Sequence, residues 1–157
     1  MNKLLSLLKK EIAIAPKLIS WFEIPVYDFK RGLLFYSKVF KHLDFDVTEF
    51  NGIPHAIFKP TNSSREFVMS GALVKYEKKN EQGCGPVLFF DANLGMEDML
   101  NRIQEYGGTI IKNKSLIKNK LEDGRTVIPK NLIDGNVGYY AYFSDSEGNK
   151  IGLYSNG

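Results

Sequence analysis

Hydrophobic positions recur at two spacings along the chain, and the first half already contains both. Ser20–Val26 is a short run of aromatic and β-branched residues that predicts a strand. Asp28 follows as a candidate N-cap, and the next apolar residues are spaced as on one face of a helix: Phe29, Leu33, Tyr36 and Phe40. Turn residues then separate three segments that predict strands: Phe45–Phe50, Ile53–Lys59 and Phe67–Lys75.

The second half repeats this order. Val87–Asp91 predicts a buried strand, and Gly107-Gly108 ends a helix with the stripe Met96, Met99, Leu100 and Ile103. A strand at 109–112 precedes a long loop at about 114–136. The last two strands, Val137–Ser144 and Lys150–Ser155, are joined by a polar turn. A pattern of strand, helix and three strands that occurs twice predicts one unit used twice around a common core.

These halves define the expected organisation of the chain. A length of 157 residues suits one domain, which we place at 19–157. Module one is 19–75, a linker occupies 76–86, and module two is 87–155. Residues 1–18 form an N-terminal extension, in which the spacing of Leu4, Leu5, Leu8 and Ile12 predicts a short amphipathic helix. That helix is expected to pack on the domain or on a partner.

Composition excludes several classes of protein. The hydrophobic fraction of 43% and the charged fraction of 25% are typical of a globular domain. The net charge is only +3, and basic residues are scattered among acidic ones. Nucleic-acid binding requires them to cluster on one face, so we expect no nucleic-acid partner.

The cysteine content and the apolar start of the chain bear on its location. The only cysteine, Cys84, excludes a disulfide within the chain and favours a reducing compartment. The apolar run at Met1–Leu8 is too short to span a membrane, and Lys9 and Lys10 follow it, whereas a signal peptide begins with its basic residues. We therefore expect a cytoplasmic protein without a membrane partner.

Four segments in this order resemble proteins of the vicinal-oxygen-chelate superfamily, the glyoxalase, bleomycin resistance and dioxygenase-like proteins. The resemblance extends over roughly residues 19–155. The four segments are Trp21–Val26 with Asp28 and Phe35-Tyr36, then Ser70–Val74, Glu105–Gly108 and Gly138–Leu153. The resemblance implies an α+β fold in which two paired βαβββ modules form a curved mixed-sheet cleft. It also implies a homodimer, because members of the superfamily often dimerise.

Many members of this superfamily hold a divalent metal in the cleft, and this sequence departs from them there. The resemblance places the ligand positions at Trp21, within Ser70–Val74, at Val87 or Leu88, and at Gly152. None of these carries the His, Glu or Gln that such sites use. We therefore expect no metal and no other cofactor, although Glu23, two residues from Trp21, remains a candidate for a lone ligand.

Strand alternation predicts which side chains face the cleft. Ala141 and Phe143 should face the helices, while Gly152, at the former metal position, should face the cleft. The ligand-binding residues predicted in this way are Trp21, Glu23, Phe89, Tyr140, Tyr142 and Tyr154. Aromatic walls with one carboxylate suit a planar or cationic organic molecule. The alternative is that these aromatic residues fill a closed core between the sheets.

Three functions remain open. The leading one is metal-free binding of a small organic molecule in the aromatic cleft. The alternative is a metal-dependent lyase, isomerase or dioxygenase of glyoxalase type, for which no catalytic residue can be assigned. The sequence contains no phosphate-binding loop, nucleophile elbow or cluster of metal ligands. The third is protein interaction through Met1–Leu18. We expect His42 and His55 to be neither ligands nor bases.

Overall fold

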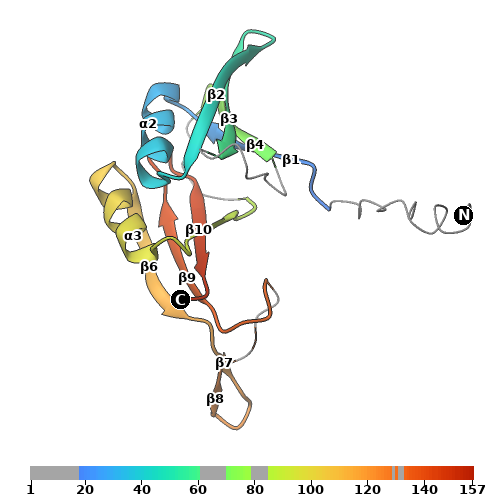
Figure 1. The fold of residues 1–157 in the computed structure, drawn as a ribbon, viewed down its shortest axis with the longest axis vertical. Helices are drawn as coiled ribbons and strands as arrows, with labels where there is room; N and C mark the ends of the chain where they lie inside the picture. Colours follow the sequence, from blue (N-terminus) through green and yellow to red (C-terminus); the bar gives the residue numbers. More distant parts are fainter. Residues whose placement is uncertain (1–17, 61–69, 79–84, 129, 131–132) are drawn as a thin grey trace, which may run out of the picture.

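The computed structural model describes residues 18–60, 70–78, 85–128, 130 and 133–157. Two four-stranded sheets follow one another along the chain, and each module contributes one helix, so that both helices lie on the same side of the sheets (Figure 1). The predicted helix of the N-terminal extension falls outside the described residues, as does most of the predicted linker.

Module one forms the first sheet. Its elements are β1 (Trp21–Val26), α2 (Phe29–Val39), β2 (Leu43–Phe50), β3 (Ile53–Pro60) and β4 (Ser70–Lys75). The strand order is β1-β4-β3-β2. The outer strand β1 runs parallel to β4, and the other pairs are antiparallel.

Module two forms a second sheet of the same design. Its elements are β5 (Phe89–Asp91), α3 (Met96–Glu105), β6 (Thr109–Leu116), β9 (Tyr139–Ser144) and β10 (Lys150–Ser155). The order β5-β10-β9-β6 repeats that of module one, and β5 again runs parallel to its neighbour. The predicted internal repeat and the α+β fold of two βαβββ modules are therefore confirmed.

The segment predicted as one long loop contains additional strands. The β6 strand continues to Leu116, because it follows β9 through two register shifts. A small hairpin then pairs β7 (Asn119–Lys120) with β8 (Thr126–Val127), and it projects from the end of the molecule (Figure 1). Gly124 at its tip has a φ of +84°, which glycine adopts without strain.

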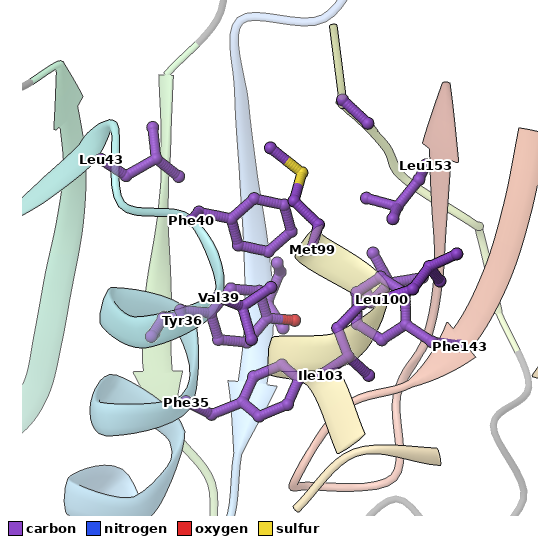
Figure 2. Packing of buried hydrophobic residues seen from close by; sticks show 14 of the residues in the cluster. Phe35, Tyr36, Val39, Phe40, Leu43, Met99, Leu100, Ile103, Phe143 and Leu153 are labelled. Atoms are coloured by element: carbon purple, nitrogen blue, oxygen red, sulfur yellow. The ribbon is translucent and has the colours of Figure 1, made fainter. Parts of the chain in front are cut away.

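The core lies between the two helices and the inner faces of both sheets. Phe35, Tyr36 and Val39 of α2 meet Met99 and Ile103 of α3 there (Figure 2). Helix α3 buries the stripe that its spacing predicted. In α2 only Tyr36 and Phe40 of the predicted stripe are fully buried, while Phe29 and Leu33 are partly buried. The other buried positions of α2 are Gly32, Phe35 and Val39. In β9, Ala141 and Phe143 are 0% exposed, whereas Tyr140 and Tyr142 point away from this core. The predicted alternation of that strand is confirmed.

The turn between β9 and β10 fastens module two to module one. Its Asp145 is almost fully buried and accepts a hydrogen bond of 2.7 Å from the Tyr36 hydroxyl of α2. Glu147, also buried, accepts bonds from the backbone N–H of Asp28 and from Nε of Arg31 at 2.7 Å. The Asn149 amide donates to the carbonyl oxygen of Pro25 in β1. We call this turn, 145–149, the clasp.

The clasp changes the ionisation of the groups that it buries. Burial, followed by the negative charge of Asp145, raises the pKa of the Tyr36 hydroxyl well above its ordinary value. Burial also raises the pKa of Asp145, although the hydrogen bonds that Asp145 accepts from Asn149 and Tyr36 oppose this effect. The hydrogen bond to Glu147 raises the pKa of Arg31. The clasp thus holds two carboxylates inside the protein through donors from α2, from its N-cap Asp28 and from the clasp itself.

Candidate functional site

A hollow of about 310 Å³ lies on the face of the second sheet that points away from the helices. We call it the aromatic hollow. Four of the six predicted ligand-binding residues gather there, from three neighbouring strands: Phe89, Tyr140, Tyr142 and Tyr154. The remaining lining residues come from the segment between β6 and β9: Ile117, Lys118 and Ile133.

The rings of the aromatic hollow contact one another edge to face. The centroids of Phe89 and Tyr142 are 5.5 Å apart, as are those of Tyr140 and Tyr142. Such pairs stabilise each other beyond their buried area. The Tyr154 hydroxyl donates a bond of 2.8 Å to Oδ1 of Asp134 at the rim. The rings therefore form a pre-ordered wall, with Phe89 still 46% exposed and able to contact a ligand.

Lysine side chains from the same sheet reach over these rings. Nζ of Lys150 lies 4.5 Å from the centroid of Tyr142, and Nζ of Lys112 lies 5.5 Å from that of Tyr140. Both distances are in the range of cation–π attraction. On the opposite face of the sheet, Lys114 lies over Tyr139 but is also paired with Glu97 of α3 at 2.8 Å. The aromatic hollow is therefore bordered by positive charge.

The other two predicted ligand-binding residues, Trp21 and Glu23, line a different hollow. It has a volume of about 420 Å³ and lies between β1, the residues before β5, and the start of β10. The Trp21 indole donates a bond of 3.2 Å to Oε1 of Glu23, and both side chains are exposed. Lys150 also lines this hollow, so the two hollows are neighbours. The structure thus divides the predicted constellation into a group of four and a pair.

A third hollow, of about 680 Å³, lies on the first sheet around the turn between β2 and β3. Glu23 and His55 both border it. His55 is buried, shares a 2.8 Å hydrogen bond with the carbonyl oxygen of Ile53, and packs edge to face on Phe50. This is the arrangement of a structural histidine, as the sequence suggested.

The positions that correspond to metal ligands do not fit a divalent cation. Gly152 has no side chain, and the Phe89 ring lies so close that an added Cβ would meet it at 2.5 Å. In the first sheet, the indole of Trp21 and the methyl group of Ala72 offer no suitable donor. Among the described residues, no group of three or more His, Cys, Asp or Glu side chains could hold an ion.

Several residues that line the aromatic hollow or lie over its rings were not predicted. Lys150 could have been found, because it alternates with Gly152 and Tyr154 along β10 and so shares their face. Lys112 could not, because its position over Tyr140 depends on the two register shifts in β6. Ile117, Lys118 and Ile133 lie in the segment that was predicted as a loop, for which the sequence gives no facing direction.

Comparison with solved structures identifies the fold of this chain. No family model and no curated protein matches the sequence. Among solved structures, a glyoxalase/bleomycin resistance protein from Albidiferax ferrireducens aligns over 88% of this chain and 98% of its own, with a TM-score of 0.56 and 16% identity. The chain has the glyoxalase/bleomycin resistance fold. The resemblance noted in the sequence is confirmed at this level.

Other proteins with the glyoxalase/bleomycin resistance fold differ in their described function. TnmS3, an antibiotic-binding protein from a Streptomyces species, aligns over 92% of this chain and 99% of its own, with a TM-score of 0.52 and 21% identity. A glyoxalase I variant from Zea mays has a TM-score of 0.56 and 16% identity, and this chain covers 45% of it. Within the described residues, no helix is long and apolar enough to cross a membrane.

Proposed function

We propose that this protein binds a small organic molecule in the aromatic hollow, without a metal. The observation that carries the proposal is the gathering of Phe89, Tyr140, Tyr142 and Tyr154 around one hollow of about 310 Å³. Concave sites lined by aromatic side chains are typical of organic ligands. The fold shared with the antibiotic-binding protein TnmS3 supports the same reading. Trp21 and Glu23 would border the ligand only if it also extended into the neighbouring hollow.

The alternative is a metal-dependent lyase, isomerase or dioxygenase of glyoxalase type, which the fold shared with glyoxalase I supports. It is the weaker proposal, because the corresponding positions lack donors and Phe89 covers Gly152. Native mass spectrometry of the purified protein separates the two. A retained organic molecule without an ion supports the binding function, whereas one bound divalent ion per chain would favour the enzyme.

We also propose that the protein is a cytoplasmic homodimer. The faces of the sheets that point away from the helices expose large apolar side chains, including Trp21 at 41%, Phe50 at 52% and Phe89 at 46%. Exposed apolar side chains that gather on one face of a protein are typical of an interface. A second copy would cover it and would close the hollows, which are open to solvent in one chain. The single cysteine supports the cytoplasmic location.

The binding function is tested by calorimetric titration with 2-naphthamide, a neutral aromatic probe. Phe89→Ala and Tyr142→Ala should each weaken binding about tenfold, because each removes one ring contact. Tyr27→Ala is the matched control, since Tyr27 is a half-exposed tyrosine outside the aromatic hollow. Equal affinities for the wild type and both hollow variants would contradict the proposed site.

A further inference from the structure

Within the part of the chain that the structure describes, Lys112 and Lys150 beside the aromatic hollow form no ion pair with a carboxylate. Among the residues that the structure describes, the ion pairs involve Arg31, Lys114 and Arg125, and neither Lys112 nor Lys150 takes part in one. Their ammonium groups lie over the rings of Tyr140 and Tyr142 instead. Lys118 adds a third positive charge to the wall of the hollow. Tyr140 and Tyr142 are therefore each covered by the ammonium group of a lysine that forms no ion pair with any described residue.

This arrangement acts against a cationic ligand. The negative face of an aromatic ring attracts one cation, and here the protein's own ammonium groups already lie over Tyr140 and Tyr142. A ligand cation would have to displace a lysine and would be repelled by the next one. An anionic group would instead meet ammonium groups that can form charge-assisted hydrogen bonds with it.

The acidic groups near the hollow do not reverse this balance. Asp134 at the rim accepts bonds from the Tyr154 hydroxyl at 2.8 Å and from the Asn156 amide at 3.4 Å. Asp91 on β5 accepts a 2.8 Å bond from the backbone N–H of Asn93. Glu23, the anchor that the sequence suggested for a cation, lines the neighbouring hollow. The ammonium groups of Lys112 and Lys150 lie over the rings of Tyr140 and Tyr142, whereas the carboxylate of Asp134 contacts the Tyr154 hydroxyl.

We propose that the ligand is an anionic aromatic compound, such as an aromatic carboxylate, and that Lys112 and Lys150 select for its charge. This proposal rests on the binding function proposed above and names the class of molecule bound. The rings of Phe89, Tyr140 and Tyr142 contact the aromatic part of the ligand. The two ammonium groups bind its anionic group at the side of the hollow nearer to β6 and the start of β10.

The test is calorimetric titration of the full chain with three probes of one shape: 2-naphthoate, neutral 2-naphthamide and cationic 2-naphthylmethylammonium. We expect 2-naphthoate to bind most tightly and the ammonium compound least tightly. Lys112→Gln and Lys150→Gln should each weaken binding of 2-naphthoate about fivefold, the loss expected for one partly exposed ion pair. The same variants should leave 2-naphthamide binding within about twofold, because its ring contacts remain.

Lys114→Gln is the matched control, because Lys114 also lies over a tyrosine of β9 but on the opposite face of the sheet. It should bind 2-naphthoate like the wild type. Tighter binding of the cationic probe, or equal binding of 2-naphthoate by the lysine variants, would overturn the charge selection alone. If 2-naphthamide bound without any effect of Phe89→Ala or Tyr142→Ala, or if no probe bound at all, the proposed function would fail with it.

Discussion

At the scale of single residues, Gly152 and Phe89 act as a pair. The Phe89 ring lies over Gly152 in the adjacent strand, where a Cβ would come within 2.5 Å of it. A glycine at this position thus allows an aromatic ring to lie where a metal-binding side chain would stand. Gly152 therefore shapes the wall of the aromatic hollow although it has no side chain, because it leaves the space that the Phe89 ring occupies.

Gly152→Ala is therefore expected to impair binding more than stability. The added methyl group forces the Phe89 ring away, and the ring can move because it is 46% exposed. The free energy of unfolding in urea should change by less than about 1 kcal/mol, while affinity for 2-naphthamide falls about tenfold. The double variant Phe89→Ala/Gly152→Ala should bind no more weakly than Phe89→Ala, because the two residues act through one contact. Additive losses would contradict this coupling.

Tyr36 gives the protein a pH-dependent stability at the alkaline end. Burial and the neighbouring Asp145 raise the pKa of its hydroxyl well above the ordinary value of 10.0. A raised pKa means that the stabilisation is complete below pH 10.0 and is lost as the pH rises through the folded-state pKa. Tyr36→Phe removes this dependence, and it leaves Asp145 with one donor fewer.

We expect Tyr36→Phe to lower the free energy of unfolding at pH 7 by about 1–3 kcal/mol, because a buried carboxylate loses a hydrogen bond. Above pH 10 its stability should fall less steeply than that of the wild type. Urea unfolding measured from pH 7 to 11 checks both effects. Tyr76→Phe, in which the altered ring is 48% exposed, should keep the wild-type slope. A Tyr36→Phe slope equal to that of the wild type would refute the assignment.

Single residues of the site could be predicted only where a strand is regular. Alternation placed Tyr140 and Tyr142 on the correct face, because β9 pairs with β10 without a register shift. It could not place Lys112, whose strand shifts register twice against β9. The charge around the hollow was therefore missed, although its aromatic residues were found. The difference matters for function, since the sequence suggested a planar or cationic molecule, whereas the lysines support the anionic ligand proposed above.

At the scale of elements, the clasp is a short turn that joins the two modules. The side chain of Glu147 is 0% exposed, and its partner Arg31 extends from the first turn of α2 with 47% exposure. A carboxylate that is buried from solvent depends on protein donors for its stabilisation, here Arg31 and the backbone N–H of Asp28. The turn therefore fixes the position of α2 relative to β9 and β10, which carry the hollow.

Arg31→Ala should accordingly destabilise the protein by about 1–3 kcal/mol, because it leaves Glu147 buried with a single donor. Arg125→Ala is the control, since its pair with Asp123 is largely exposed, at 75% and 51%. That exposed pair should contribute less than about 1 kcal/mol. Urea unfolding of both variants at pH 7 measures the difference. Equal losses would mean that Arg31 acts only as a surface residue.

Most elements could be predicted from spacing, because each module alternates one helical stripe with several strands. The strands at 21–26, 53–60 and 150–155 lie within a residue of their predicted bounds. The β7–β8 hairpin was missed, because each of its strands is only two residues long. So short a pattern cannot be separated from a polar loop. Its neighbours Ile117 and Ile133 nevertheless line the hollow.

At the scale of the whole molecule, the repeat predicted two modules but not their relative placement. The sequence placed Trp21, Glu23 and the tyrosines in one cleft, whereas in one chain they line two neighbouring hollows. The placement is set by contacts across the repeat, such as those of Asp145 and Tyr36, which no periodicity describes. A second copy would be needed to bring the exposed face of one sheet over a hollow of the other.

The proposed homodimer predicts that the oligomeric state depends on that exposed face. Phe50 and Val47 lie on opposite faces of β2 and are 52% and 55% exposed. Only Phe50 shares the face that points away from the core. Sedimentation at micromolar concentration should show a dimer for the wild type and for Val47→Glu, and a monomer for Phe50→Glu, because a buried carboxylate without a partner opposes association. If binding needs the closed hollow, Phe50→Glu should also bind 2-naphthoate more weakly. A monomeric wild type would leave the aromatic hollow as a complete site within one chain.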